Sequence, residues 1–282
     1  MGMDALSSPW HGRRVLVTGC TGFLGRAVTR ELLDRGAIVA GLVRDPAGCG
    51  QFTREQAAGQ FWPVYGRAED RSRLHSAMAV HEVSAVLHLA SAGERGTETL
   101  LQAAAKYHPR VPVVMVKPAG QLRLMSEDEP TRTQPVGIAR FGELFGSGER
   151  KLLRVVPRTV TGLLKSETVA PADSRTRDFV FVRDAARACL TLAETVGASC
   201  ESLDCTFRSG WEHSDQSMAK LVAAVFAGNQ PTDDSAETPD NPLGWQPSLT
   251  LGAAVAETIA WYREFLRTRS VGTRSAELRR VA

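Results

Sequence analysis

Three glycines spaced three residues apart stand near the start of the chain, in the segment Thr18-Gly19-Cys20-Thr21-Gly22-Phe23-Leu24-Gly25. An apolar run precedes them and an amphipathic run follows, so the pattern predicts a strand, a tight turn and a helix. In such a turn the first glycine permits the bend, the second lets a phosphate approach, and the third lets the helix pack closely. Because the N–H groups at a helix N-terminus attract anions, we expect the turn to bind the pyrophosphate of a dinucleotide. The residues assigned to this role are Gly19, Thr21, Gly22, Phe23, Leu24 and Gly25.

The end of the second predicted strand bears on which dinucleotide is bound. An NAD site usually has a carboxylate here, which accepts hydrogen bonds from the ribose hydroxyls. In this chain the strand ends with Val43, whose side chain cannot accept a hydrogen bond, and Arg44 and Asp45 follow. A guanidinium suits the 2′-phosphate of NADPH, although Arg44 could also be a solvated loop residue and Asp45 could reach a ribose hydroxyl. We therefore predict NADPH, with NADH as the alternative, and assign Arg44 and Asp45 to the site.

Strand-like and helix-like segments alternate along the first half of the chain, which indicates βαβ units and a parallel sheet. The strands predicted there are 14–18, 38–43, 63–65, 85–89 and 111–116. The helices predicted there are 23–35, a short one within 51–60, 71–80 and 97–106. Later segments predict a helix at 138–145, strands at 152–156 and 179–182, and helices at 184–195, 216–227 and 250–266. The fold class is therefore α/β, with a doubly wound parallel sheet of the Rossmann type.

We expect the chain to divide into three consecutive parts. Residues 1–162 would form the dinucleotide-binding domain, and residues 163–267 would hold the remaining Rossmann elements and a small, truncated substrate region. Residues 268–282 form a basic tail that we expect to be disordered, because arginines crowd there with little apolar material between them.

Composition excludes several classes of function. The net charge of +3 over 282 residues is too small to indicate nucleic-acid binding, and no apolar run is long enough to cross a membrane. The five cysteines form no Cys-x-x-Cys pair and stand near no histidine cluster, which indicates reduced thiols and no metal site. We expect a cytoplasmic protein whose partner is a small molecule.

Further motifs resemble the short-chain dehydrogenase/reductase superfamily, in its extended branch of nucleotide-sugar epimerases and dehydratases. Besides the glycine turn, they are Ala68-Glu69-Asp70, His88-Leu89-Ala90-Ser91, the run 177–184 and the run 243–247. The resemblance implies that Ala68 and Glu69 contact the adenine and that Leu89, Ala90 and Ser91 run beneath the cofactor. The run Leu42-Val43-Arg44-Asp45-Pro46 is similar to the atypical, NADP-binding branch.

The catalytic pair of this superfamily is absent from the aligned positions. Its members use Tyr-x-x-x-Lys on one helix, where the lysine lowers the pKa of the tyrosine that transfers the proton. Aligned on the helix predicted at 138–145 and the residues just before it, the motif places Val136 at the tyrosine and Arg140 at the lysine, so we assign no catalytic residue. Ser91 and Lys117 could assist, although Ser91 is better suited to contact the cofactor and Lys117 could equally be a solvated loop residue.

The substrate region also departs from the family. The resemblance implies a long insertion that covers a sugar nucleotide, but only 14 residues separate Gly162 from Arg177. We therefore predict a ketoreductase that transfers hydride from NAD(P)H to a ketone of a secondary metabolite, an aromatic polyketide such as an angucyclinone. A phenol or enol beside that ketone would supply the proton. The alternative is a non-catalytic NADP(H)-binding sensor or scaffold, and isomerisation or dehydration also stays open.

Overall fold

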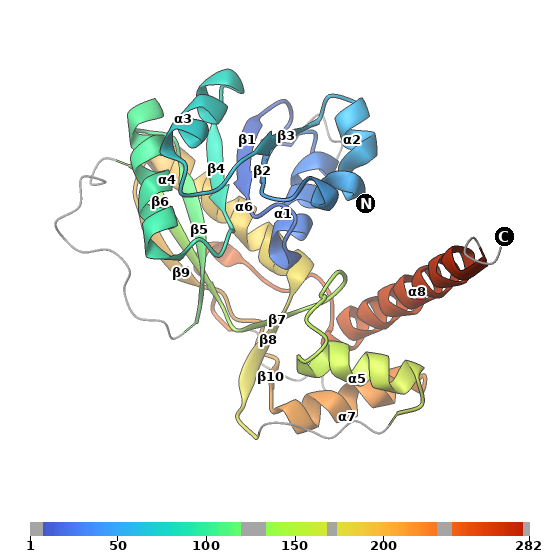
Figure 1. Ribbon diagram of the computed structural model, residues 1–282. Helices are drawn as coiled ribbons and strands as arrows, with labels where there is room; N and C mark the ends of the chain where they lie inside the picture. The colour runs from blue at the N-terminus through green and yellow to red at the C-terminus, as the bar shows by residue number, and fades with distance from the viewer. Residues whose placement is uncertain (1–7, 120–133, 168–173, 230–238, 279–282) are drawn as a thin grey trace. The chain divides into compact units, whose positions relative to one another are not determined.

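A computed structural model of the chain describes residues 8–119, 134–167, 174–229 and 239–278. The chain divides into two compact units, each assembled from separated stretches (Figure 1). The first unit comprises Met1–Phe141, Arg183–Phe207 and Asp240–Trp245, and the second comprises Gly142–Val182, Arg208–Pro239 and Gln246–Ala282. The consecutive division expected from the sequence, with a boundary at residue 162, does not coincide with these units.

The first unit is built on a seven-stranded sheet with the order β3-β2-β1-β4-β5-β6-β9. Its strands are β1 (Arg14–Thr18), β2 (Ile38–Val43), β3 (Phe61–Tyr65), β4 (Ala85–His88), β5 (Val113–Pro118), β6 (Val136–Phe141) and β9 (Leu203–Thr206). Every neighbouring pair is parallel. The chain begins at β1, moves outward to β3 and returns to the other side of β1, so the strand order reverses between β1 and β4. The doubly wound α/β sheet predicted from the sequence is confirmed.

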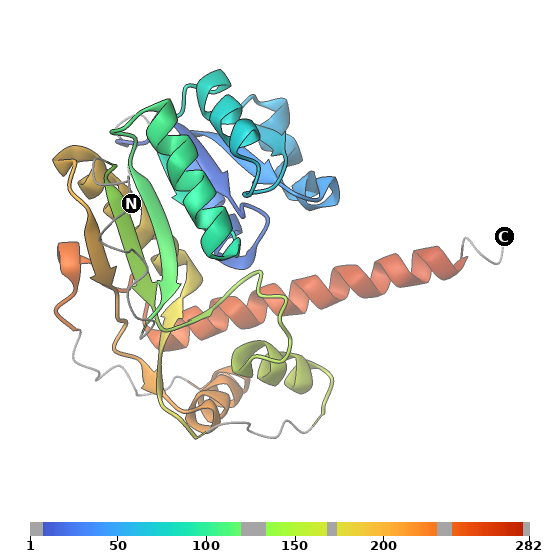
Figure 2. The same cartoon turned by 60° about the vertical axis from the view of Figure 1, so that its left-hand side comes forward.

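Helices cover both faces of this sheet. They are α1 (Phe23–Asp34), the 3-10 helix η2 (Pro46–Phe52), α2 (Thr53–Ala57), α3 (Arg71–Val80), α4 (Gly93–Tyr107), α6 (Val182–Ser199) and the 3-10 helix η3 (Pro242–Gly244). α3 and α4 bury Leu74 and Leu100 in one cluster with Val86 of β4. On the other face α1 and α6 lie together, since Nε of Arg187 donates to Oε1 of Glu31 at 3.4 Å. Figure 2 shows α4 in front of the sheet and α6 behind it.

The second unit has its own small sheet and its own core. Its strands β7 (Glu143–Phe145), β8 (Arg177–Phe181) and β10 (Glu212–His213) have the order β10-β8-β7, with β7 parallel and β10 antiparallel to β8. Its helices are α5 (Val155–Leu164), α7 (Asp215–Phe226) and α8 (Leu251–Leu278). The hydroxyl of Tyr262 on α8 donates to the backbone oxygen of Glu149 at 2.5 Å, and burial raises the pKa of that hydroxyl. α8 continues beyond residue 267, into the segment where a disordered tail is expected.

Two predicted elements are wrong, and both lie in runs that contain several apolar residues. The helix predicted at 138–145 is replaced by β6 and β7, and the strand predicted at 152–156 gives way to a turn followed by α5. All six residues of β6 are buried. A strand covered on both faces lacks the alternation of polar and apolar residues by which a strand is recognised, so its sequence can be mistaken for a buried helix. The short strands β9 and β10 are not predicted at all.

The alignment of the catalytic motif on residues 135–140 is therefore also wrong. Val136 and Arg140 lie on β6, not on a helix. Nε and Nη2 of Arg140 donate to the two carboxylate oxygens of Asp204 at 2.6 and 2.8 Å, and these hydrogen bonds raise the pKa of Arg140. The guanidinium thus joins β6 to β9. The connection from β5 to β6, residues 119–135, contains neither tyrosine nor lysine, and no tyrosine in the chain stands four residues before a lysine.

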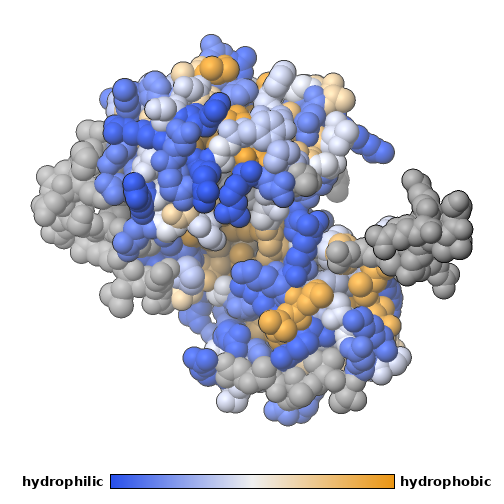
Figure 3. Space-filling model, in the orientation of Figure 1, coloured by the Kyte–Doolittle hydropathy of each residue, from blue (hydrophilic) through white to orange (hydrophobic). Residues whose placement is uncertain are grey.

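The surface of the first unit is mainly hydrophilic on the face seen in Figure 3. Among the described residues of that unit, the exposed large apolar side chains are Trp62, Tyr65, Val80 and Leu243. No helix within the described part of the chain has the length and apolar character that crossing a membrane requires.

Candidate functional site

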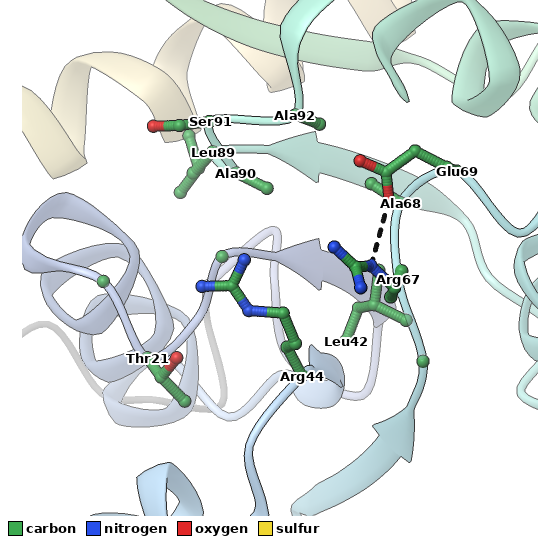
Figure 4. Close-up of a pocket in the computed structure, with 13 residues that line it drawn as sticks. Thr21, Leu42, Arg44, Arg67, Ala68, Glu69, Leu89, Ala90, Ser91 and Ala92 are labelled. Atoms are coloured by element: carbon green, nitrogen blue, oxygen red, sulfur yellow. Dashed lines mark ion pairs between the residues drawn. The ribbon is translucent and has the colours of Figure 1, made fainter. Parts of the chain in front are cut away.

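A pocket of about 270 Å³ opens in the first unit at the carboxyl ends of four neighbouring strands (Figure 4). The residues that line it are Gly19, Thr21, Gly22, Leu42, Arg44, Gly66, Arg67, Ala68, Glu69, Leu89, Ala90, Ser91 and Ala92. They belong to β2 or follow β1, β2, β3 and β4, which lie in the order β3-β2-β1-β4. Because neighbouring strands are ~4.8 Å apart, a ligand that crosses all four ends spans roughly 14 Å. The pocket therefore suits an elongated ligand and lies where the strand order reverses, the usual binding position in such sheets.

Gly19 forms the turn at the end of β1. Its φ angle is +71°, a conformation that side chains disfavour, and a Cβ there would lie 2.7 Å from the nitrogen of Ala90. The turn closes through the N–H of Gly22, which donates to the oxygen of Gly19 at 2.8 Å. Only a glycine at position 19 therefore allows the segment after β4 to lie against the turn.

Gly25 brings helix α1 against the same turn. A Cβ on Gly25 would lie 1.9 Å from the oxygen of Gly19, which is too close for any side chain. Gly22 is the N-cap residue of α1 and has no side chain that could cap the helix. The N–H groups of the first helical turn, which have no partner within the helix, therefore remain available to an anion in the pocket.

A chain of hydrogen bonds fixes the end of β4 to the end of β1. Oγ1 of Thr18 lies 2.7 Å from Nδ1 of His88, and Nε2 of His88 lies 3.2 Å from Oγ1 of Thr97. The Thr97 hydroxyl donates its proton to the oxygen of Gly93 at 2.8 Å, so it accepts from Nε2, and Nδ1 in turn accepts from Thr18. The N–H of Ala90 also donates to Oγ1 of Thr18, at 3.4 Å. His88 thus positions the segment that lines the pocket after β4.

The electrostatic surroundings keep His88 neutral. Burial lowers its pKa to about 4, and the positive charge of Lys117 acts in the same direction. Burial also lowers the pKa of Lys117, while the carboxylate of Glu94 opposes this shift. Lys117 lies on β5 and is not one of the lining residues, so it belongs to the strand next to the pocket and not to a loop.

Nine of the thirteen residues assigned to the cofactor from the sequence line the pocket together. They are Gly19, Thr21, Gly22, Arg44, Ala68, Glu69, Leu89, Ala90 and Ser91. The other four, Phe23, Leu24, Gly25 and Asp45, do not line it. Gly25 lies beneath the turn, Phe23 and Leu24 belong to the first turn of α1, and Asp45 is exposed beyond Arg44.

Four lining residues were not assigned from the sequence: Leu42, Gly66, Arg67 and Ala92. Gly66 and Arg67 immediately precede Ala68 in the loop after β3. Assigning this whole loop to the cofactor site, and not only Ala68 and Glu69, would have included them. Nε of Arg67 lies 3.8 Å from Oε2 of Glu69, and this ion pair lies within the pocket (Figure 4). No group of histidine, cysteine, aspartate or glutamate side chains in the described ranges is suited to hold a metal ion.

Comparison with family models identifies the family. The model of the NAD dependent epimerase/dehydratase family matches residues 15–115 and 128–201, more than half of the chain. The chain belongs to the NAD-dependent epimerase/dehydratase family. The pocket of this family member lies within the first matched segment.

Solved structures with a similar fold include several enzymes that act on sugar nucleotides. A UDP-glucose-4-epimerase from Stenotrophomonas maltophila, with bound NAD and formylated UDP-arabinopyranose, has a TM-score of 0.73 and 18% identity over 91% of this chain and 99% of that one. A dTDP-glucose 4,6-dehydratase from Bacillus anthracis str. Ames, in complex with NAD, has a TM-score of 0.72 and 17% identity over 90% and 97%. A UDP-glucose 4-epimerase from Thermotoga maritima, with UDP-glucose, has a TM-score of 0.69 and 18% identity over 90% and 99%. At these identities the likeness shows that the chain shares their fold.

The close packing of α1 on the turn predicts the effect of a single methyl group. We expect Gly25→Ala to lower the free energy of unfolding by about 3 kcal/mol, because the Cβ would overlap a backbone oxygen that cannot move independently. Denaturant unfolding measures this change. Gly50→Ala is the matched control, since no heavy atom lies within 4 Å of a Cβ there. Equal stability of the two variants would show that α1 does not approach the turn as described.

Neutral His88 predicts a loss of stability in acid. An unfolded histidine has a pKa of 6.5, and the folded one has a pKa of about 4, so only the unfolded state takes up a proton between these values. The contribution of His88 is therefore complete above pH 6.5 and declines as the pH falls towards 4, by about 3 kcal/mol in total. Unfolding free energies measured across this range should decline less steeply in His88→Gln. The same slope in both proteins would show that His88 is not held neutral.

Proposed function

We propose that this protein is an NADPH-dependent ketoreductase that reduces a ketone of a secondary metabolite, an aromatic polyketide such as an angucyclinone. The observation that carries the proposal is a combination of two features. The pocket for a dinucleotide is formed, while the sequence has no Tyr-x-x-x-Lys pair that could serve as the acid. The proposal places the protein in the cytoplasm, in keeping with its five free cysteines.

The lining of the pocket fits a nicotinamide dinucleotide. There is no room for a Cβ at Gly19 or Gly25, so the backbone of the turn lies close to the ligand beside the N-terminus of α1. The described structural relatives include proteins whose structures contain NAD. In the proposed complex the pyrophosphate lies at this turn, the adenosine lies beside the loops after β2 and β3, and the nicotinamide lies beyond the end of β4.

NADPH is favoured over NADH by the residues at the end of β2. Val43 is 1% exposed and offers no acceptor, and Asp45 does not line the pocket. Arg44 does line it, and its guanidinium points into the pocket in Figure 4. A guanidinium at this position suits a 2′-phosphate better than a pair of ribose hydroxyls.

The described side chains around the pocket can orient a bound ligand, but none of them is an evident proton donor for the reduction. When bound, NADPH supplies the hydride for the carbonyl carbon. His88 cannot readily protonate the carbonyl oxygen, because Thr18 and Thr97 engage both of its ring nitrogens and its pKa is about 4. A phenol or enol next to the ketone can give its proton to that oxygen and regain one from water. Ser91 and Lys117 then act at most by polarising the carbonyl.

The substrate region supports a substrate other than a sugar nucleotide. Only residues 165–176 connect α5 to β8, a short connection at the place where the resemblance to nucleotide-sugar enzymes implies a longer insertion. An aromatic ketone needs less enclosure than a nucleoside diphosphate. Holding its carbonyl against the nicotinamide already lowers the activation barrier of hydride transfer substantially.

The direct test is the oxidation of NADPH by peri-hydroxylated aromatic ketones. We expect the purified protein to consume NADPH and form one alcohol per NADPH, followed by absorbance and by chromatography of the product. The same ketone with its neighbouring hydroxyl methylated is the matched control. It should react at least about 100-fold more slowly, since general acid assistance typically contributes 10²–10⁴-fold.

Each alternative has its own outcome. Binding of NADPH without oxidation by any ketone would end the reductase proposal and leave the sensor or scaffold. Equal rates with the free and methylated hydroxyl would show that the protein provides the acid itself. Isomerised or dehydrated product without net consumption of NADPH would indicate the chemistry of the wider family.

The cofactor choice predicts a selective effect of Arg44→Ala. We expect its KM for NADPH to rise about tenfold or more and its KM for NADH to change little, because a charge-assisted hydrogen bond contributes about 1.5–3 kcal/mol. Arg54→Ala is the control for the loss of a nearby positive charge, because Arg54 is exposed on α2 and does not line the pocket. Equal changes in the two KM values would overturn the assignment of Arg44 to the 2′-phosphate.

A further inference from the structure

A second arginine, Arg67, lies in the same pocket as Arg44. The two side chains come from loops that leave adjacent strands at the same level. β2 and β3 are parallel with Val43 opposite Tyr65, and the N–H of Gly66 donates to the oxygen of Val43 at 3.0 Å. Arg44 and Arg67 therefore start from backbones about one strand spacing apart, and Figure 4 shows both guanidinium groups within the pocket.

The described lining of the pocket carries a net positive charge, which suits an anionic group on the ligand. Among the thirteen lining residues, Arg44 and Arg67 are the cations and Glu69 is the carboxylate, which gives a net charge of +1. The 3.8 Å separation of Nε of Arg67 from Oε2 of Glu69 is too long for a hydrogen bond. The Arg67 side chain is 71% exposed, so Glu69 restrains the guanidinium without occupying its hydrogen-bond donors.

We propose that Arg67 binds the 2′-phosphate of NADPH together with Arg44, so that two guanidinium groups from the loops after β2 and β3 hold one dianion. This inference rests on the proposed use of NADPH. A phosphate monoester presents three oxygens and carries nearly two negative charges, so two planar donors can bind it at once. One arginine neutralises only part of that charge.

Two other roles for Arg67 lead to different results. If the guanidinium stacked on the adenine, Arg67 would contribute equally to NADPH and NADH, which share that ring. If it were only a solvated side chain, its removal would change neither affinity. A contact with the 2′-phosphate affects NADPH alone, so comparing the two cofactors separates the three roles.

The experiment measures equilibrium binding to the full-length protein by calorimetry, with NADPH, NADH, 2′,5′-ADP and 5′-AMP as probes. We expect Arg67→Ala to weaken binding of NADPH and 2′,5′-ADP by roughly ten- to a hundredfold and to change NADH and 5′-AMP by less than about threefold. Arg71→Ala is the matched control, because Arg71 is exposed four residues away and does not line the pocket. In Arg44→Ala/Arg67→Ala the two losses should not add, since both residues bind the same group.

The outcomes keep this inference apart from the proposed function. Equal weakening of NADPH and NADH, or no change in either, overturns the role of Arg67 while the wild-type affinities still support a dinucleotide enzyme. Strictly additive losses show that the two arginines bind different groups and also overturn it. A wild-type protein that binds neither dinucleotide ends both proposals, and one that binds NADPH but reduces no ketone ends only the reductase.

Discussion

The contact between Gly25 and the carbonyl oxygen of Gly19 is the constraint on which the pocket depends. With no Cβ in the way, α1 starts directly beneath the turn that ends β1, and its first N–H groups are aimed past that turn. The same turn has room to touch the segment after β4 only because Gly19 also lacks a side chain. A larger residue at either position would separate the helix, the turn and β4, which are the three elements that meet at one end of the pocket.

The order of the strands in the sheet extends the site from the glycine turn along the ends of the neighbouring strands. Because the strand order reverses between β1 and β4, helices leave the two strands towards opposite faces and the strand ends stay open. The bonds from Thr18 through His88 to Thr97 connect the ends of β1 and β4 to the first turns of α4, and they do so with a neutral ring. All of the described residues that line the pocket belong to the first unit, while the second unit has a separate core around Phe145, Phe179 and Val255.

The sequence predicts the parts of this arrangement that depend on local patterns. The glycine spacing, the flanking strand and the amphipathic helix identify β1, the turn and α1 almost to the residue, and nine assigned residues meet in the pocket. β6 is misread because its burial on both faces is a consequence of the sheet and not of its own sequence. Arg67 is missed for a similar reason, since its place beside Arg44 follows from the pairing of β2 with β3. The features that the sequence does not reveal are therefore mostly those that depend on contacts between residues far apart in the chain.

The alignment used to look for the catalytic pair fails for the same reason. The residues compared with tyrosine and lysine lie on a strand, where Arg140 has the separate task of holding Asp204 of β9. The absence itself rests on composition, because no tyrosine in the chain precedes a lysine at the required spacing. Among the lining residues that the structure describes there is no tyrosine, histidine, lysine or cysteine, and Tyr262 belongs to the second unit with its hydroxyl bonded to Glu149. The described lining offers only the hydroxyls of Thr21 and Ser91 as uncharged donors, and Lys117 lies on the neighbouring strand. The carboxylate of Glu94 opposes the lowering of the pKa of Lys117 by burial, and the proposed reaction uses Lys117 to polarise the carbonyl and the substrate to supply the proton.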